Sequence, residues 1–236
     1  MRKRLIWIIC LSLLFCLIVF SACSNDKSYK TNVQEYIPDY KNTTCNILKD
    51  KNIELHVENS VSNSKDEISN LLNLMQSDYS ILTRVFDLDT KIKCYIIADE
   101  YILGNDKAVY QNGVLICNES AVKSGGYRKS FAGACIQSTE YWKQYGAYAY
   151  AFNCEYSDEE LKEYYANDKN LELTLFSAYF IGDFNNNTDY AIKTAYSFGN
   201  FVINTYGYKN FINANLTDYR TEYLSFLGIN REFNIP

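Results

Sequence analysis

Histidine is the scarcest residue that bears on the chemistry of this chain, because only His56 occurs among 236 residues. A His-Glu-x-x-His zinc site needs two imidazoles one helical turn apart, so the sequence excludes it. Ser-His-Asp and Cys-His catalysis would both have to be built around His56, and no pattern brings a nucleophile to it. His56 is therefore interpreted as a residue on the face of a strand, and no catalytic, cofactor-binding or metal-binding residue is predicted.

The sequence also lacks a Cys-x-x-Cys pair, an internal repeat and a phosphate loop. Gly125-Gly126 is not followed by the Gly-Lys-Ser/Thr string that a phosphate loop requires. Cys10 and Cys16 precede Cys23, and five cysteines follow it: Cys45, Cys94, Cys117, Cys135 and Cys154. Their spacing does not predict a zinc site, and it leaves their pairing into disulfides open.

The N-terminal residues resemble a bacterial lipoprotein export signal. Met1-Arg-Lys-Arg4 is cationic, residues 5–20 are almost wholly apolar, and Ser21-Ala22 places small residues before Cys23. An apolar run of this length suits a signal h-region and is short for a membrane span. The resemblance to the lipobox implies that residues 1–22 are removed and that Cys23 carries lipid, palmitate-type acyl chains included. Phe20 departs from the pattern, in which Leu is usual.

This signal predicts a location and constrains the partners. The protein is expected at the cell membrane, anchored by lipid on Cys23 and facing away from the cytoplasm. Removal of residues 1–22 takes away three positive charges and no acids, so the net charge of −5 becomes −8. An acidic chain without a basic patch beside the anchor gives no reason to expect nucleic acid as a partner.

The rest of the chain predicts a tether followed by one domain. Residues 23–50 hold the lipidated cysteine, a polar tether and the segment leading into the folded part. Residues 51–236 are expected to form the domain, with a sheet in about 51–120 and helices in about 121–236. A hydrophobic content of 47% is enough for one substantial core.

Periodicity places the elements within that domain. Alternation predicts a strand over 53–57, residues 92–98 are predicted as a second strand, and Asn112-Gly113 predicts a tight turn inside 109–117. Ser64-Lys-Asp-Glu67 is a capping box ahead of a helix of about 20 residues. Further helical segments are predicted in the second half of the chain: 128–142, one opened by Ser157-Asp-Glu-Glu160, 171–181, 189–206 and 217–227. The order predicts an α+β fold with a small mixed sheet and a long helix first, then a mainly helical part.

This order and two local strings resemble the zincin-like metallopeptidases of the gluzincin type. Trp142-Lys-Gln-Tyr-Gly-Ala-Tyr-Ala-Tyr150 matches the frame of the Trp-x-x-Glu-Gly-x-Ala-x-Tyr string, whose Glu is the third zinc ligand in that group. Residues 195–207 and 224–228 are similar to the helices that follow it. The resemblance spans residues 50–230 and implies a zincin-like fold with a peptide-binding cleft.

The departures from the group matter most for function. Tyr145 stands where the third ligand would be, and residues 129–137, where the metal helix would lie, offer one thiol and no acid. The resemblance therefore implies a domain that has lost its zinc and its hydrolytic activity. Its remaining role would be to bind a peptide, a glycan or a protein partner in the former cleft. The predicted cleft lining is aromatic: Tyr141, Trp142, Tyr145, Tyr148 and Tyr150.

Two other functions stay open at this point. The chain could be an unrelated α+β lipoprotein that serves as a subunit in envelope assembly. It could also be a hydrolase based on carboxylates alone, since two separated acids leave no local signature. Glu159, Glu160 and Glu163 are the nearest acidic group, and their place at a helix start is explained by capping and the helix dipole.

Overall fold

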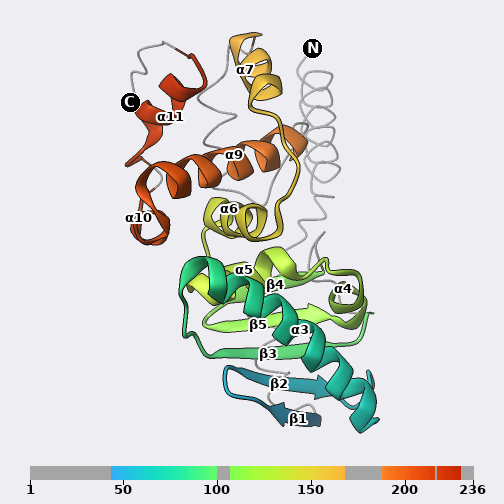
Figure 1. The fold of residues 1–236 in the computed structure, drawn as a ribbon. Helices are drawn as coiled ribbons and strands as arrows, with labels where there is room; N and C mark the ends of the chain where they lie inside the picture. The colour runs from blue at the N-terminus through green and yellow to red at the C-terminus, as the bar shows by residue number, and fades with distance from the viewer. Residues whose placement is uncertain (1–43, 100–106, 168–187, 216, 230–236) are drawn as a thin grey trace, which may run out of the picture. The chain divides into compact units, whose positions relative to one another are not determined.

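The computed structural model describes residues 44–99, 107–167, 188–215 and 217–229 (Figure 1). The predicted export signal, Cys23, most of the tether and the helix predicted over 171–181 lie outside these residues. The fold class is α+β, as predicted: a mixed sheet is built early in the chain and helices dominate the later part.

The sheet contains five strands among the described residues, in the order β1-β2-β3-β5-β4. The strands β2, β3 and β5 run parallel in the centre, and β1 and β4 pair antiparallel at the two edges. Their bounds are β1 Cys45–Lys49, β2 Ile53–Glu58, β3 Ile92–Ile97, β4 Ala108–Gln111 and β5 Val114–Asn118. Central parallel strands are buried on at least one face by helices, which explains their apolar composition here.

Strand β1 corrects one sequence expectation. Residues 45–49 were assigned to the tether and leading segment, but they pair with β2, with Cys45 opposite Glu58 and Lys49 opposite Glu54. Five residues with an uneven apolar pattern give a weak strand signal on their own. Pairing with β2 supplies the ladder of hydrogen bonds that makes this segment a strand.

The long helix α3 (Lys65–Phe86) forms where the capping box predicted it. The side chain of Ser64 accepts a hydrogen bond from the Glu67 backbone N–H at 3.4 Å. The Glu67 carboxylate does not return to Ser64; it accepts from Ser62 Oγ, which in turn accepts from the Ser64 N–H at 3.0 Å. The apolar face of α3, which includes Leu72 and Met75, packs against β2 and the core of the sheet.

The β4–β5 hairpin also forms as predicted. Asn112 and Gly113 have φ values of 52° and 75°, the left-handed pair that a two-residue turn between antiparallel strands requires. Cys94 on β3 and Cys117 on β5 lie buried beside each other, with sulfurs 3.7 Å apart as free thiols. Burial raises the pKa of Cys94 well above its usual value, so this thiol is protonated and inert at neutral pH.

The helical part begins after β5. Its helices are α4 Glu119–Ser124, α5 Arg128–Ile136, α6 Tyr141–Phe152, α7 Asp158–Asn167, α9 Thr188–Tyr206, α10 Tyr208–Asn213 and α11 Arg220–Phe226. The helices predicted over 189–206 and behind Ser157 are confirmed, while α4 and α10 had not been predicted. Among the described residues, no helix is long and apolar enough to cross a membrane.

The segment predicted as one helix over 128–142 is two helices. Gln137 adopts a left-handed conformation with φ of 56° and ends α5, and Glu140 caps the start of α6 from an extended conformation. No Gly or Pro marks this break. Its cause lies in packing, because Gly133 of α5 sits directly against the Gln144 side chain of α6.

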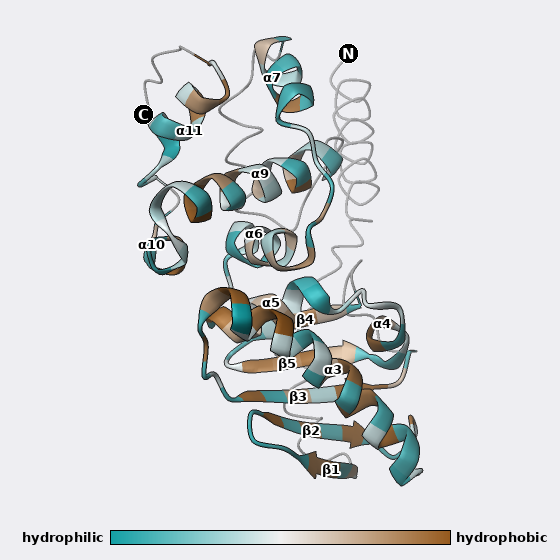
Figure 2. Ribbon diagram, viewed as in Figure 1, coloured by the Kyte–Doolittle hydropathy of each residue, from teal (hydrophilic) through white to brown (hydrophobic). Residues whose placement is uncertain are grey.

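The larger of two hydrophobic cores joins the sheet to the helices, and a small one around Ile97 and Ile116 lies apart from it. Helix α5 packs on β4, β5 and α3, and α6 packs on both α5 and α9. Figure 2 shows β5 and α5 as largely apolar, which agrees with their position inside the core. Trp142 of α6 fills the space towards the later helices, with its ring 5.1 Å from Phe198 and 5.4 Å from Phe211.

Candidate functional site at the junction of α5 and α6

Helix α5 occupies the position from which a functional side chain could act on the sheet edge. Every residue from Lys129 to Ile136 is buried, because α5 lies between the sheet and α6. Ser130 Oγ donates to the backbone carbonyl of Ala108 at 3.1 Å, which fixes the start of α5 beside the edge strand β4. The start of α5, where Lys129 packs on α6, is therefore held next to an edge of the sheet.

A buried cation lies in this junction. Lys129 is only 6% exposed, and its ammonium lies 4.7 Å from the ring centre of Tyr145 and 5.2 Å from that of Tyr141. Aromatic faces stabilise a cation electrostatically, most strongly where water is excluded. The faces of the two tyrosines therefore form part of the surroundings of this buried side chain.

The tyrosines belong to a stripe on one face of α6. Tyr141, Tyr145, Tyr148 and Phe152 recur at steps of four, three and four residues, so they share a face. Tyr196 of α9 extends the stripe, with its ring 5.9 Å from Tyr145 and 6.1 Å from Tyr148. Burial raises the pKa of Tyr148 to about 12, so its hydroxyl stays protonated at neutral pH.

A buried carboxylate holds the start of α5 in place. Asp78, in the middle of α3, is 4% exposed and accepts from Tyr127 Oη at 2.7 Å and Arg128 Nε at 2.8 Å. The Arg128 guanidinium also lies over the ring of Phe152 at 5.0 Å. Burial and the nearby Asp78 carboxylate raise the pKa of Tyr127 far above its usual value. Asp78 thus links α3, α5 and the aromatic stripe of α6.

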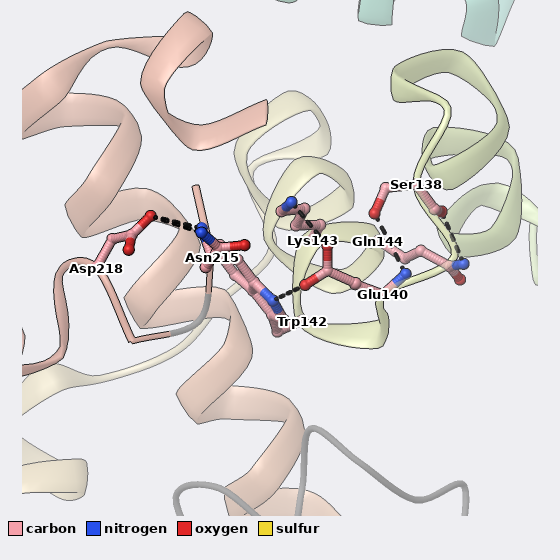
Figure 3. A network of polar contacts seen from close by, with 7 residues as sticks. All are labelled: Ser138, Glu140, Trp142, Lys143, Gln144, Asn215 and Asp218. Atoms are coloured by element: carbon pink, nitrogen blue, oxygen red, sulfur yellow. Dashed lines mark hydrogen bonds and ion pairs between the residues drawn. The ribbon is translucent and has the colours of Figure 1, made fainter. Parts of the chain in front are cut away.

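The turn between α5 and α6 is fixed by polar contacts (Figure 3). The Glu140 carboxylate accepts from Trp142 Nε1 at 2.8 Å and from Lys143 Nζ at 2.7 Å. Gln144 donates to the Ser138 carbonyl at 3.1 Å, which folds α6 back onto the end of α5. The Glu140 contacts therefore hold the first turn of α6, and the Gln144 bond joins α6 to the segment that follows α5.

The structure separates the five aromatic residues predicted to line a cleft. Tyr141, Tyr145 and Tyr148 lie together on the stripe beside Lys129. Trp142 points into the core between α6, α9 and α10, and Tyr150 contacts Phe86 at 6.2 Å between ring centres. Only the first three are brought to one face.

Sequence reasoning had not singled out Lys129, Arg128 or Asp78. A signal was present for Asp78, which interrupts the apolar positions Leu71, Met75 and Leu82 on the buried face of α3. A carboxylate on a buried helix face needs a hydrogen-bonding or cationic partner, because an unpaired buried charge is costly. No comparable signal existed for Lys129, because its burial depends on how α5 and α6 cross.

The residues at the junction do not fit a zinc ion of the kind the peptidase resemblance implies. Zinc takes thiolate, imidazole or carboxylate ligands, whereas Lys129, Ser130 and Tyr145 supply an ammonium and two hydroxyls. The two groups of zinc-binding type are the Cys135 thiol, whose pKa is raised by burial, and the Glu140 carboxylate, which is bound by Trp142 and Lys143. Within the described parts of the chain, no group of three or more His, Cys, Asp or Glu side chains is placed to hold a metal ion.

His56 lies away from this junction, on the sheet face opposite α3. Its Nε2 is 2.6 Å from Glu54 Oε1, and its ring lies 4.5 Å from that of Tyr95. Glu54 also pairs with Lys49 at 2.9 Å. Hydrogen bonds from Lys49 and His56 lower the pKa of Glu54 to about 2.

This lowered pKa predicts a specific pH dependence. The ionised Glu54 stabilises the fold fully above its ordinary pKa of 4.5, and this contribution is lost as the pH falls towards 2. Solvent screening at this half-exposed group limits the contribution to about 1 kcal/mol or less. Glu54→Gln should therefore reduce the fall in melting temperature that the protein shows between about pH 5 and about pH 2. Glu159→Gln, at an exposed acid, should leave that profile unchanged; an identical effect of both would contradict the prediction.

Neither a protein-family model nor a characterised protein matches this sequence.

Proposed function

We propose that this protein is a lipid-anchored, non-hydrolytic binding protein on the outer side of a cell membrane, and that it holds an extended peptide segment beside β4. The anchor is supported by the cationic, apolar and small-residue pattern that ends at Cys23. The binding role is supported by the position of the α5–α6 junction next to an edge strand. No resident metal or cofactor is part of the proposal.

The arrangement of elements supports kinship with metallopeptidase-like domains. The resemblance requires residues 128–142 and the string Trp142–Tyr150 to pack around one cleft beside the sheet. Helices α5 and α6, which contain these residues, pack on each other, and α5 packs on β4 and β5.

The observation that carries the proposal is the ammonium of Lys129 at this junction. In a peptidase of the group that the sequence resembles, this region would hold zinc. Here a fixed cation packs on Tyr145, the residue at the third-ligand position. A fixed ammonium supplies positive charge without activating water, because it has no open coordination position for a water molecule. Such a site favours binding over hydrolysis.

The edge of β4 supplies the means of holding a peptide. The Asn118 N–H donates to the Lys107 carbonyl at 2.9 Å, which sets the alternation of hydrogen-bonded pairs along the hairpin. By that alternation, Ala108 and Tyr110 direct their N–H and C=O groups away from β5. The Ala108 carbonyl already accepts from Ser130 Oγ, so the outward groups of Tyr110 are the ones a peptide would bind. Among the described residues no strand pairs with this outer edge. An extended peptide can add there as a further strand.

Substitution of Tyr110 tests this proposal. Tyr110→Pro removes an outward N–H without breaking the pairing with β5, so the hairpin should persist. We expect Tyr110→Pro to weaken peptide binding about tenfold or more. The complex would lose one hydrogen bond at the edge, and the proline ring would also obstruct the approach of the peptide. The matched control Tyr110→Val keeps the N–H and should retain binding. Peptides selected from a random pool on the immobilised full chain, then measured by fluorescence anisotropy, provide the readout.

Two outcomes would contradict the proposal. If no peptide is enriched on the full chain, or if Tyr110→Pro and Tyr110→Val bind equally well, β4 is not the binding edge. A role as a subunit of an envelope complex would then be the better explanation.

A further inference from the structure

A cluster of four lysines lines a hollow on the β1–β2 side of the sheet, across the sheet from the edge strand β4. The hollow has a volume of about 280 Å³ and lies where the β1–β2 turn meets the start of β3. The lysines that line it are Lys49, Lys51, Lys91 and Lys93, and all four are exposed. Asp50 and Glu54 also line it, so four ammonium groups face two carboxylates in a chain whose net charge is −5.

The two carboxylates are already engaged by other side chains. Asp50 accepts from Gln76 Nε2 at 2.6 Å, and Glu54 is bound by Lys49 and His56. Within the described ranges, Lys51 and Lys91 form no ion pair with another residue. Their charges are therefore available to a partner outside the chain.

An exposed apolar side chain adjoins the lysines. Ile47 is 55% exposed and lies two residues before Lys49 on β1, so both point to the same face of the sheet. Cationic side chains around an exposed apolar one are typical of a surface that rests in the headgroup region of a membrane. A soluble anion would make no use of Ile47.

We propose that Ile47 and the four lysines, here called the lysine surface, dock the domain onto anionic lipid headgroups of the membrane that carries its anchor. The inference depends on the proposed lipid at Cys23, which brings the chain to that membrane. About 20 residues separate Cys23 from β1, a length that allows the domain either to lie on the bilayer or to stand away from it. Contact with anionic headgroups would hold the domain on the bilayer. The domain would then have one defined orientation relative to the membrane when it binds a peptide.

Lysine footprinting of the anchored full chain tests this docking. The lipidated protein is incorporated into vesicles of neutral lipid alone or with added anionic lipid, vesicle-bound protein is isolated by flotation, and acylation of each lysine is measured by mass spectrometry. Lys49, Lys51, Lys91 and Lys93 should react about fivefold more slowly on anionic vesicles, the factor expected for one lysine charge near an anionic surface. Lys123 and Lys209, exposed elsewhere on the chain, should react equally on both. High salt should abolish the difference.

A charge variant makes the test specific. In Lys51→Gln combined with Lys91→Gln, the protection of Lys49 and Lys93 should fall to its value on neutral vesicles. The matched control, Lys123→Gln with Lys209→Gln, removes the same charge and should keep that protection.

Each remaining outcome distinguishes the docking from the anchor. Flotation with both vesicle types but equal reactivity of the four lysines would overturn the docking while leaving the anchor intact. Flotation with anionic vesicles only would support the docking and refute the anchor, whereas no flotation at all would refute both. Soluble polyphosphate can be added to protein on neutral vesicles. If it slows acylation of the four lysines as much as anionic lipid does, the partner is a soluble polyanion, which also overturns the proposal.

Discussion

Asp78→Ala is expected to lower the free energy of unfolding by about 3 kcal/mol. Removing the buried carboxylate leaves the groups that bind it without a partner. The substitution leaves the buried Tyr127 hydroxyl without its acceptor and the Arg128 guanidinium without its carboxylate. The Arg128 side chain is 41% exposed and regains some hydration, which places the loss at the lower end of the usual range. Urea unfolding of the purified chain measures it.

Two further variants separate the pair from helix effects. Asn73→Ala, at an exposed position of the same helix, should not reduce stability, because alanine favours helix. Tyr127→Phe should cost about 1 kcal/mol, the value of one hydrogen bond. If Asp78→Ala unfolds at the same urea concentration as the unmodified protein, Asp78 does not hold α5 in place.

Gly199→Ala is expected to destabilise the protein by about 3 kcal/mol, at the upper end for overpacking a close contact. A methyl group at residue 199 would lie 2.4 Å from the Cα of Gly146, where α6 and α9 cross. The nearest atoms all belong to the backbone of Gly146, so they cannot move aside unless the whole helix shifts. The melting temperature or the urea midpoint measures the effect.

The sign of this effect is itself diagnostic. Glycine to alanine inside a helix usually stabilises by about 1 kcal/mol, so a loss can only come from the crossing. Asn204→Ala, at an exposed position of α9, should be neutral or slightly stabilising. A stabilised Gly199→Ala protein would mean that α6 and α9 do not approach at these glycines.

Much of the fold was predictable because its strongest signals are local. The helix behind Ser64 has a cap and a long apolar stripe, and the β4–β5 hairpin has Asn112-Gly113 at its turn. Strand β1 was missed because five residues carry too little pattern. The break at Gln137 was missed because it depends on the contact between Gly133 and Gln144, which lie on different helices.

The candidate site was predictable only in part, for the same reason. Helical spacing alone places Tyr141, Tyr145 and Tyr148 on one face of α6, and it also separates Trp142 from them. The burial of Lys129 and its place over Tyr145 arise from the angle at which α5 and α6 cross. No property of the sequence near Lys129 indicates a buried cation.

The most direct test of the central claim is the zinc content of the purified, metal-exposed protein together with its activity on a broad set of peptides. A junction built around the Lys129 ammonium predicts zinc far below one ion per chain and no cleavage of any peptide. Zinc at one ion per chain, or cleavage that a chelator abolishes, would contradict the proposal that this domain binds peptides without hydrolysing them.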